Sequence, residues 1–165
     1  MTNTTKDLVT AEDKLKLLFE HRPWETEPSY ADWVDEPTKY KCRIVRNEHT
    51  GTLCGYVGIP RGHRMYGMTY QEAERDDNNF HVHGGLTYSG SIEDADDGYH
   101  YFGFDTAHGG DFSPGLAVSM LKWTGEPDDV REFFREEEYR TFEYVQQEVM
   151  NLALQLRYCD KGGKP

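Results

Sequence analysis

The strongest constraint on the fold is an apolar stripe in the last part of the chain. Between residues 139 and 158, apolar side chains recur at spacings of 3, 4, 3 and 4, at Phe142, Val145, Val149, Leu152 and Leu156. This spacing is typical of one face of an α-helix, and Gly162-Gly163 predicts that the helix ends near Cys159. The stripe is too short to favour a coiled coil, so we expect it to pack on a sheet.

The rest of the chain predicts that sheet. Two segments of alternating or apolar residues, 40–46 and 53–59, are separated by a short stretch containing Gly51 and indicate a β-hairpin. Further strands are expected at 80–88 and 99–105, an extended aromatic arm at 22–38, and helices at 11–20 and near 128–138. We therefore predict the α+β class, with an antiparallel sheet of about four or more strands packed by N- and C-terminal helices. The 165 residues suit a single domain with a flexible tail at 160–165.

Composition excludes several classes of function. Thirty acidic and eighteen basic residues give a net charge of −12, which argues against a partner such as duplex nucleic acid or an anionic membrane. The chain has no apolar run of about 18 residues and no signal-peptide pattern at its start, so we expect a cytoplasmic protein. The three cysteines, which are widely spaced, fit neither a disulfide framework nor a zinc module and are expected to be reduced.

The charge is unevenly distributed along the chain. Residues 38–70 contain six basic residues and one acidic residue, whereas residues 71–111 contain ten acidic residues and one basic residue. Two interpretations remain open: solvated surfaces that attract each other, or a cleft with one cationic and one acidic wall.

Histidine, aspartate and glycine gather between Phe80 and Asp111. His81 and His83 alternate with apolar residues and would share one face of a strand, and His108 lies between Asp105 and Asp111. Imidazoles and carboxylates are common ligands of zinc, manganese and iron. A divalent metal held by these five residues is therefore one hypothesis. Our leading expectation is that the protein binds no cofactor. In an enzyme of this kind, the catalytic residues would be His83, Asp105 and His108.

A second interpretation of the same segment needs no metal. Gly84-Gly85 allows close approach of a ligand to the backbone, and neighbouring hydroxyl groups and aromatic rings can bind a sugar or a base. The segment 58–64 places two arginines and a histidine on a tight loop that is suited to a phosphate. A nucleophilic pair of Cys54 with His81 or His83 is a weaker alternative. The candidate ligand-binding residues are Arg61, His63, Arg64, His81, His83, Gly84, Gly85, Thr87, Tyr88, Asp105, His108 and Asp111.

Four segments carry a resemblance to a known family: CGYVGIPRGH (54–63), VHGGLTYSG (82–90), FGFDTAHGGD (102–111) and YRTFEYVQQEVMNLALQL (139–156). In these segments the chain resembles a family of small proteins encoded by bacteriophages and bacterial genomes. The resemblance implies a phage or bacterial source and draws attention to His83, Asp105, His108 and Asp111. It implies no mechanism.

Three functions are compatible with these features. The leading hypothesis is a phage-encoded accessory protein, located in the bacterial host cytoplasm, that sequesters a nucleotide or an NAD-derived signal from a defence pathway. The alternative is a metal-dependent hydrolase acting on a nucleotide-like substrate through the His/Asp residues. The third is an acidic inhibitor that binds a protein. A homo-oligomer is compatible with all three.

Overall fold

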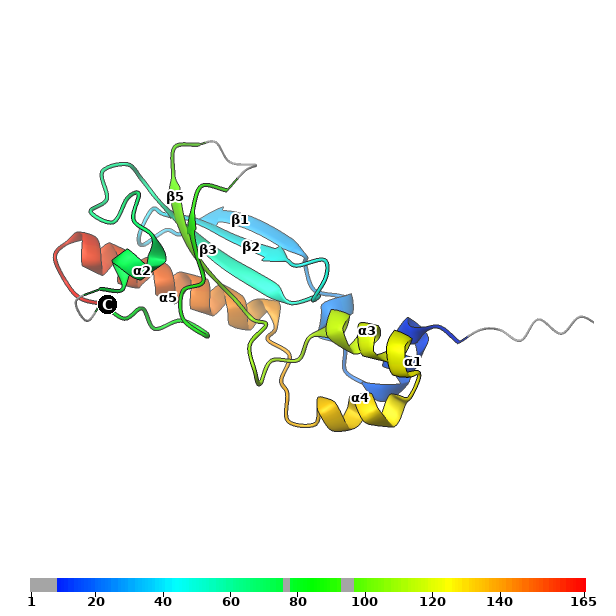
Figure 1. Ribbon diagram of the computed structural model, residues 1–165. Coiled ribbons are helices and arrows are strands. Elements are labelled where there is room, and N and C mark those ends of the chain that lie inside the picture. The colour runs from blue at the N-terminus through cyan, green and yellow to red at the C-terminus, as the bar shows by residue number, and fades with distance from the viewer. Residues whose placement is uncertain (1–8, 76–77, 93–96) are drawn as a thin grey trace, which may run out of the picture.

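The computed structural model describes residues 9–75, 78–92 and 97–165 and shows an α+β fold (Figure 1). Its centre is an antiparallel five-stranded sheet with the order β1-β2-β3-β5-β4. The strands are β1 (Tyr30–Val34), β2 (Lys41–Arg46), β3 (Leu53–Ile59), β4 (Tyr88–Gly90) and β5 (His100–Asp105). The predicted hairpin of β2 and β3 is confirmed, and β1 extends the sheet from the segment expected to be an extended arm.

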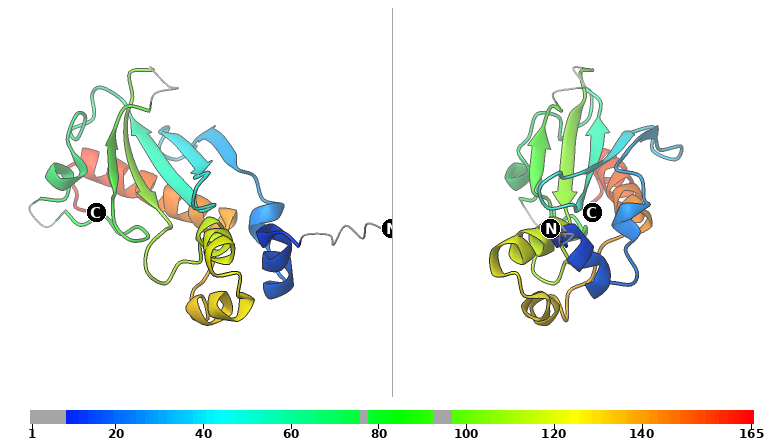
Figure 2. Two further views of the ribbon diagram at one scale, coloured as in Figure 1. Left: turned by 45° about the vertical axis from the view of Figure 1, so that its right-hand side comes forward. Right: turned by 90° about the vertical axis from the view of Figure 1, so that its right-hand side faces the viewer.

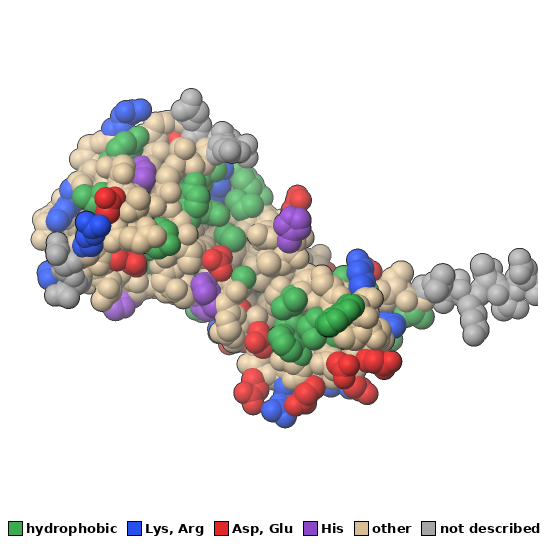
Figure 3. Space-filling view, in the orientation of Figure 1, with side chains coloured by type: hydrophobic (Ala, Val, Ile, Leu, Met, Phe, Trp, Pro, Cys, Tyr) green, Lys and Arg blue, Asp and Glu red, His purple; other side chains and the backbone are tan. Residues whose placement is uncertain are grey.

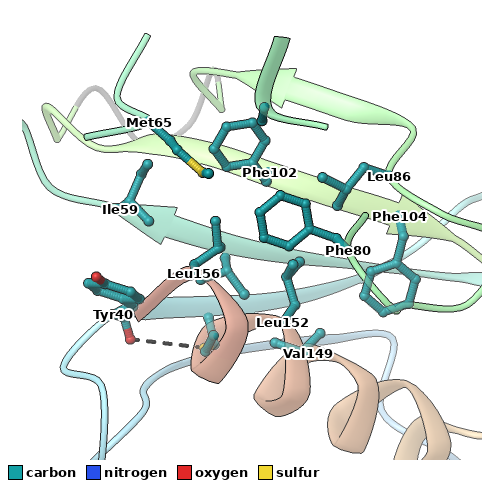
Figure 4. Packing of buried hydrophobic residues seen from close by; sticks show 14 of the residues in the cluster. Tyr40, Ile59, Met65, Phe80, Leu86, Phe102, Phe104, Val149, Leu152 and Leu156 are labelled. Atoms are coloured by element: carbon teal, nitrogen blue, oxygen red, sulfur yellow. Dashed lines mark hydrogen bonds between the residues drawn. The ribbon is translucent and has the colours of Figure 1, made fainter. Parts of the chain in front are cut away.

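The C-terminal helix α5 (Phe142–Asp160) covers one face of the sheet, as the stripe predicts (Figure 1). Thr141 caps its first turn by accepting a hydrogen bond from the Tyr144 amide. Val149, Leu152 and Leu156 have no exposed surface and belong to the same buried cluster as Phe102 and Phe104 of β5 (Figure 4). After α5, the amides of Gly162 and Gly163 donate to the carbonyls of Cys159 and Tyr158, so the predicted tail begins with a hydrogen-bonded turn.

Three further helices form a separate group at one end of the sheet (Figure 2). They are α1 (Ala11–Leu18), α3 (Pro114–Thr124) and α4 (Pro127–Phe133). These helices share a second hydrophobic cluster, built around Leu15, Phe112, Leu121 and Phe134. The N-terminal helix therefore packs on α3 and α4. Two short elements complete the fold, a 3-10 turn at Pro23–Glu25 and α2 at Tyr70–Ala73.

One predicted strand is wrong. Residues 80–87 form a loop, and only Tyr88–Gly90 pairs with β5. The reason is local, because Gly84 and Gly85 both have positive φ values, which break an extended strand. Phe80 still enters the main core, where it lies among the side chains of β5 and α5 (Figure 4).

The basic residues of the segment 38–70 do not line one continuous wall. Four of them form ion pairs with acidic residues: Lys39 with Glu36, Lys41 with Asp97, Arg43 with Asp32, and Arg46 with Glu27. Within the described part of the chain, no helix has the length and apolar character needed to cross a membrane.

Candidate functional site

Three segments that are distant in sequence meet where β5 ends. The first segment is the loop that follows Asp105 and leads toward α3, and the second is the loop 80–87, which precedes β4. The third segment is the start of α5 together with the residues just before it. The Thr87 amide donates to the Gly103 carbonyl over 2.9 Å, which holds the second loop at this end of the sheet. Thr87 Oγ1 also donates to Asp105 Oδ2 at 3.0 Å.

His83 is held from two sides by its ring nitrogens. Its Nδ1 lies 2.9 Å from the hydroxyl of Tyr144, and its Nε2 lies 2.7 Å from Oδ2 of Asp111. Its amide donates to Glu148 on α5. With 14% of its side chain exposed, the ring has a fixed orientation but still reaches solvent.

Asp111 lies at the buried centre of a cluster that also contains His83 and His108, and 1% of its side chain is exposed. Arg140 Nε donates to Oδ1 at 2.9 Å, and the amide of His108 donates to Oδ2 at 3.1 Å. Burial acts to raise the pKa of Asp111, but the hydrogen bonds from Arg140 and His83 outweigh it and hold the pKa below its ordinary value. The carboxylate is therefore charged at neutral pH.

His108 completes the cluster, and one of its ring nitrogens has no hydrogen bond. Its Nδ1 is buried and without a partner among the described residues. The nearest carboxylate oxygens are Asp111 Oδ2 at 3.6 Å and Asp105 Oδ1 at 3.7 Å. These distances are too long for hydrogen bonds. The ring itself is one-third exposed, so the cluster opens to solvent at this residue.

This geometry is suited to a cation. One ligand atom each from His83, His108 and Asp111 lies within 4.8 Å of the other two. Two imidazole nitrogens and one carboxylate form a common ligand set for zinc and for iron, and three protein ligands leave a position open for water. Of the five predicted metal ligands, the structure brings these three together and places Asp105 beside them.

His81 lies outside this cluster. It precedes His83 by two residues, but the expectation that both share a strand face is wrong because the segment is a loop. The His81 amide and carbonyl are both bonded to the side chain of Gln155, and the residue is exposed.

The predicted basic loop lies at the other end of α5. His63 is buried, with Nε2 at 2.9 Å from the Leu156 carbonyl and Nδ1 accepting from the Met65 amide. Arg64 donates to the Cys159 carbonyl, and Arg61 lies over the Tyr66 ring. Tyr144 and Leu156 are separated by twelve residues, which is about 18 Å along a helix. The predicted residues therefore form two groups, and His63 and Arg64 hold the end of α5.

The remaining candidates border the His/Asp cluster. Gly84 has a φ of +67° and lies against the His108 ring, whereas a side chain at Gly85 would meet open space. Asp105, Thr87 and Tyr88 line a hollow of about 370 Å³. Its other lining residues are Asn47, Thr50, Thr52, Cys54, Tyr56, Phe104 and Ala107.

Cys54 lines the hollow as a protonated thiol. Burial, assisted by the nearby charge of Asp105, raises the pKa of Cys54 to about 11. A nucleophilic cysteine needs its thiolate form near neutral pH, so this environment does not favour the Cys54 alternative.

Sequence analysis missed three residues of the site, namely Arg140, Tyr144 and Glu148. Tyr144 and Glu148 are four residues apart and therefore lie on one side of the first turns of α5, next to the apolar stripe, and Arg140 precedes the helix by two residues. That spacing was the available signal, because polar residues in a regular row beside a buried stripe face the edge of the core.

Comparisons of the chain with protein-family models, with curated proteins and with solved structures found no match.

Proposed function

We propose that the protein is a metal-dependent hydrolase whose centre is formed by His83, His108 and Asp111. The observation that carries this proposal is the unpartnered Nδ1 of His108, which is buried beside two further ligand atoms. A buried polar nitrogen without a partner costs about 1–3 kcal/mol. A cation bound by the three side chains would remove that cost and use the negative charge of Asp111.

The surrounding residues fit such a centre. When His83 binds a cation through Nε2, its Nδ1–H can donate to the Tyr144 hydroxyl, which fixes the tautomer and the ring orientation. Arg140 holds the second carboxylate oxygen of Asp111 in the same way. These contacts orient the side chains of His83 and Asp111 in the protein without metal.

The chemistry supported is attack by water on a polarised substrate. A zinc ion held by these residues would lower the pKa of its water to about 7, and a nearby carboxylate could accept the proton. Two observations support Asp105 in this role: its side chain is one-third exposed, and its Oδ1 lies 3.7 Å from His108 Nδ1. We therefore assign Asp105 as the general base.

The hollow beside Asp105 supports a polar, uncharged substrate group. Its lining offers the hydroxyls of Thr50 and Tyr56, the side-chain amide of Asn47, and no lysine or arginine. Hydroxyls and tyrosine rings suit the sugar or base of a nucleotide-like molecule better than its phosphate.

Metal titration tests the centre. Chelator-treated protein should bind one zinc or manganese ion in calorimetry, and His83→Ala should abolish this binding. His81→Ala is the matched control, because this exposed histidine lies two residues away and outside the cluster. Circular dichroism of both variants without metal must show the parental fold. Failure of the parent to bind either metal, or equal binding by the two variants, would remove the proposal.

A second experiment separates hydrolysis from sequestration. The metal-loaded protein is incubated with a mixture of nucleotides and NAD-derived molecules, and the products are identified by mass spectrometry. A hydrolase releases cleaved products, whereas a sequestering protein releases its ligand unchanged on denaturation. Asp105→Asn should keep metal affinity but lower turnover by about 100-fold or more, the range typical of general acid–base catalysis. Turnover at the parental rate would remove Asp105 from that role.

A further inference from the structure

Helix α3 carries two exposed apolar side chains, Leu116 and Trp123, on a side of the helix where, among the described residues, only Met120 packs partly against the second hydrophobic cluster. Leu116, Met120 and Trp123 recur at intervals of four and three residues and therefore share one side of the helix, which we call the α3 face. Leu116 is 45% exposed and Trp123 is 89% exposed. Figure 3 shows apolar side chains gathered over α3.

The helix is already held by its other side. Ala117 and Leu121 are buried in the second cluster, with Pro114 also buried at the start of the helix. Trp123 is therefore not needed to pack α3. A helix that is apolar on two sides is normally buried on both, and tryptophan is among the side chains enriched in the energetic centres of protein interfaces.

The surroundings of the α3 face are acidic. From residue 126 to residue 138, the chain carries seven acidic residues and two arginines. Asp128, Asp129 and Glu132 on α4 are exposed, and Figure 3 shows acidic side chains bordering the apolar ones over this helical group. Lys122, next to Trp123, lies 3.2 Å from Glu12.

We propose that the α3 face is a docking surface for a basic protein partner, with Trp123 as its central anchor. The acidic border selects the partner's charge. A second copy of this chain fits poorly, because each copy carries a net charge of −12 and would bring the same acidic border to the contact. The proposal is independent of the metal centre.

Tryptophan fluorescence can test the proposal on the whole protein. Trp24 and Trp33 are partly buried, so a change at the surface is reported mainly by Trp123. The probe is a synthetic amphipathic helix of lysine and leucine, and its glutamate–leucine counterpart is the charge control. We expect the basic peptide to shift the emission to the blue and reduce quenching by acrylamide, and the effect should weaken as salt is added.

Two leucine variants provide the matched comparison. Leu116→Ser should weaken peptide binding at least tenfold, whereas Leu154→Ser, at an exposed leucine of α5, should leave it unchanged. Trp123→Ser, followed with a labelled peptide, should lose binding while unfolding at the parental temperature. Equal binding of both peptides, or equal effects of the two leucine variants, would overturn the proposal. So would a dimer in sedimentation that Trp123→Ser dissociates, because the occupant would then be a second copy.

Discussion

Gly84 lies so close to the ring of His108 that a Cβ at position 84 would come within 2.3 Å of the imidazole Cε1. Its φ of +67° is also one that side-chain-bearing residues rarely adopt. The position of His108 therefore depends on the absence of a side chain at residue 84.

This relationship predicts that Gly84→Ala displaces His108 and lowers metal affinity by tenfold or more. The control is Gly85→Ala, which also places alanine at a positive φ, of +82°, but with no atom within 4 Å of the new Cβ. Both variants should lose about 1–2 kcal/mol of stability from the backbone conformation. Only Gly84→Ala should lose metal binding in calorimetry, and parental affinity in that variant would show that His108 is not a ligand.

Tyr144→Phe removes the hydroxyl that contacts His83 Nδ1 and leaves the ring in place. We expect metal affinity to fall by about 10- to 100-fold, the range found when an orienting partner of a metal-binding histidine is removed. Tyr158→Phe, at an exposed tyrosine of the same helix, should have no effect. An equal result for the two variants would mean that Tyr144 does not orient His83.

His63 should make folding sensitive to mild acid. Burial lowers the pKa of His63 below its ordinary 6.5, and both ring nitrogens are already used in the neutral form. As pH falls below 6.5, the unfolded chain binds a proton that the folded protein resists. Stability is therefore fully present above this pH and decreases below it, until the folded pKa is reached.

Urea unfolding from about pH 7.5 to about pH 5 measures this effect. The pKa of His100 is lowered by burial as well, so His63→Gln should reduce the pH dependence without abolishing it. A variant with the parental pH dependence would contradict the assignment to His63.

Val149→Asp should cost several kcal/mol, because it would bury a charge without a partner. Val149 has no exposed surface, and its Cγ2 packs on Gly55 of β3. Leu154→Asp places the same charge on the exposed side of α5 and should change stability by about 0.5 kcal/mol or less. Thermal unfolding of the two proteins makes the comparison, and similar melting temperatures would contradict the burial of the stripe.

The features that sequence analysis predicted well are those in which one period dominates a long segment. The stripe of α5 and the β2–β3 hairpin are of this kind, since each buries one face in the main core. Helix α3 was not identified, because apolar residues on both of its sides obscure a single stripe and Pro114-Gly115 suggests a turn. The strand prediction for 80–88 was wrong because two glycines with positive φ interrupt the extended conformation. The segment before them alternates apolar and polar residues as a strand would.

The candidate site was predicted in part for a related reason. His83, His108 and Asp111 come from two sequence segments that were already identified, and the end of β5 brings these segments together. Arg64 and His63 suggested a phosphate site because their residue types fit one. Only the fold shows that they contact the end of α5, where their donors meet backbone carbonyls. Contacts of this kind depend on where a helix ends in space, which local sequence does not specify.

Asp111 also has a position that links the two parts of the molecule. Its neighbour Phe112 belongs to the second hydrophobic cluster. The backbone of Asp111 forms an isolated β-bridge with Glu138, just before the chain enters α5. The proposed cation would therefore bind where the chain crosses between the sheet and the helical group that carries the α3 face. If binding of the cation changes the affinity of the α3 face for its partner, thermodynamic linkage requires that binding of the partner changes the affinity for the cation by the same factor. The two proposed sites would then be measurable as a single coupled equilibrium.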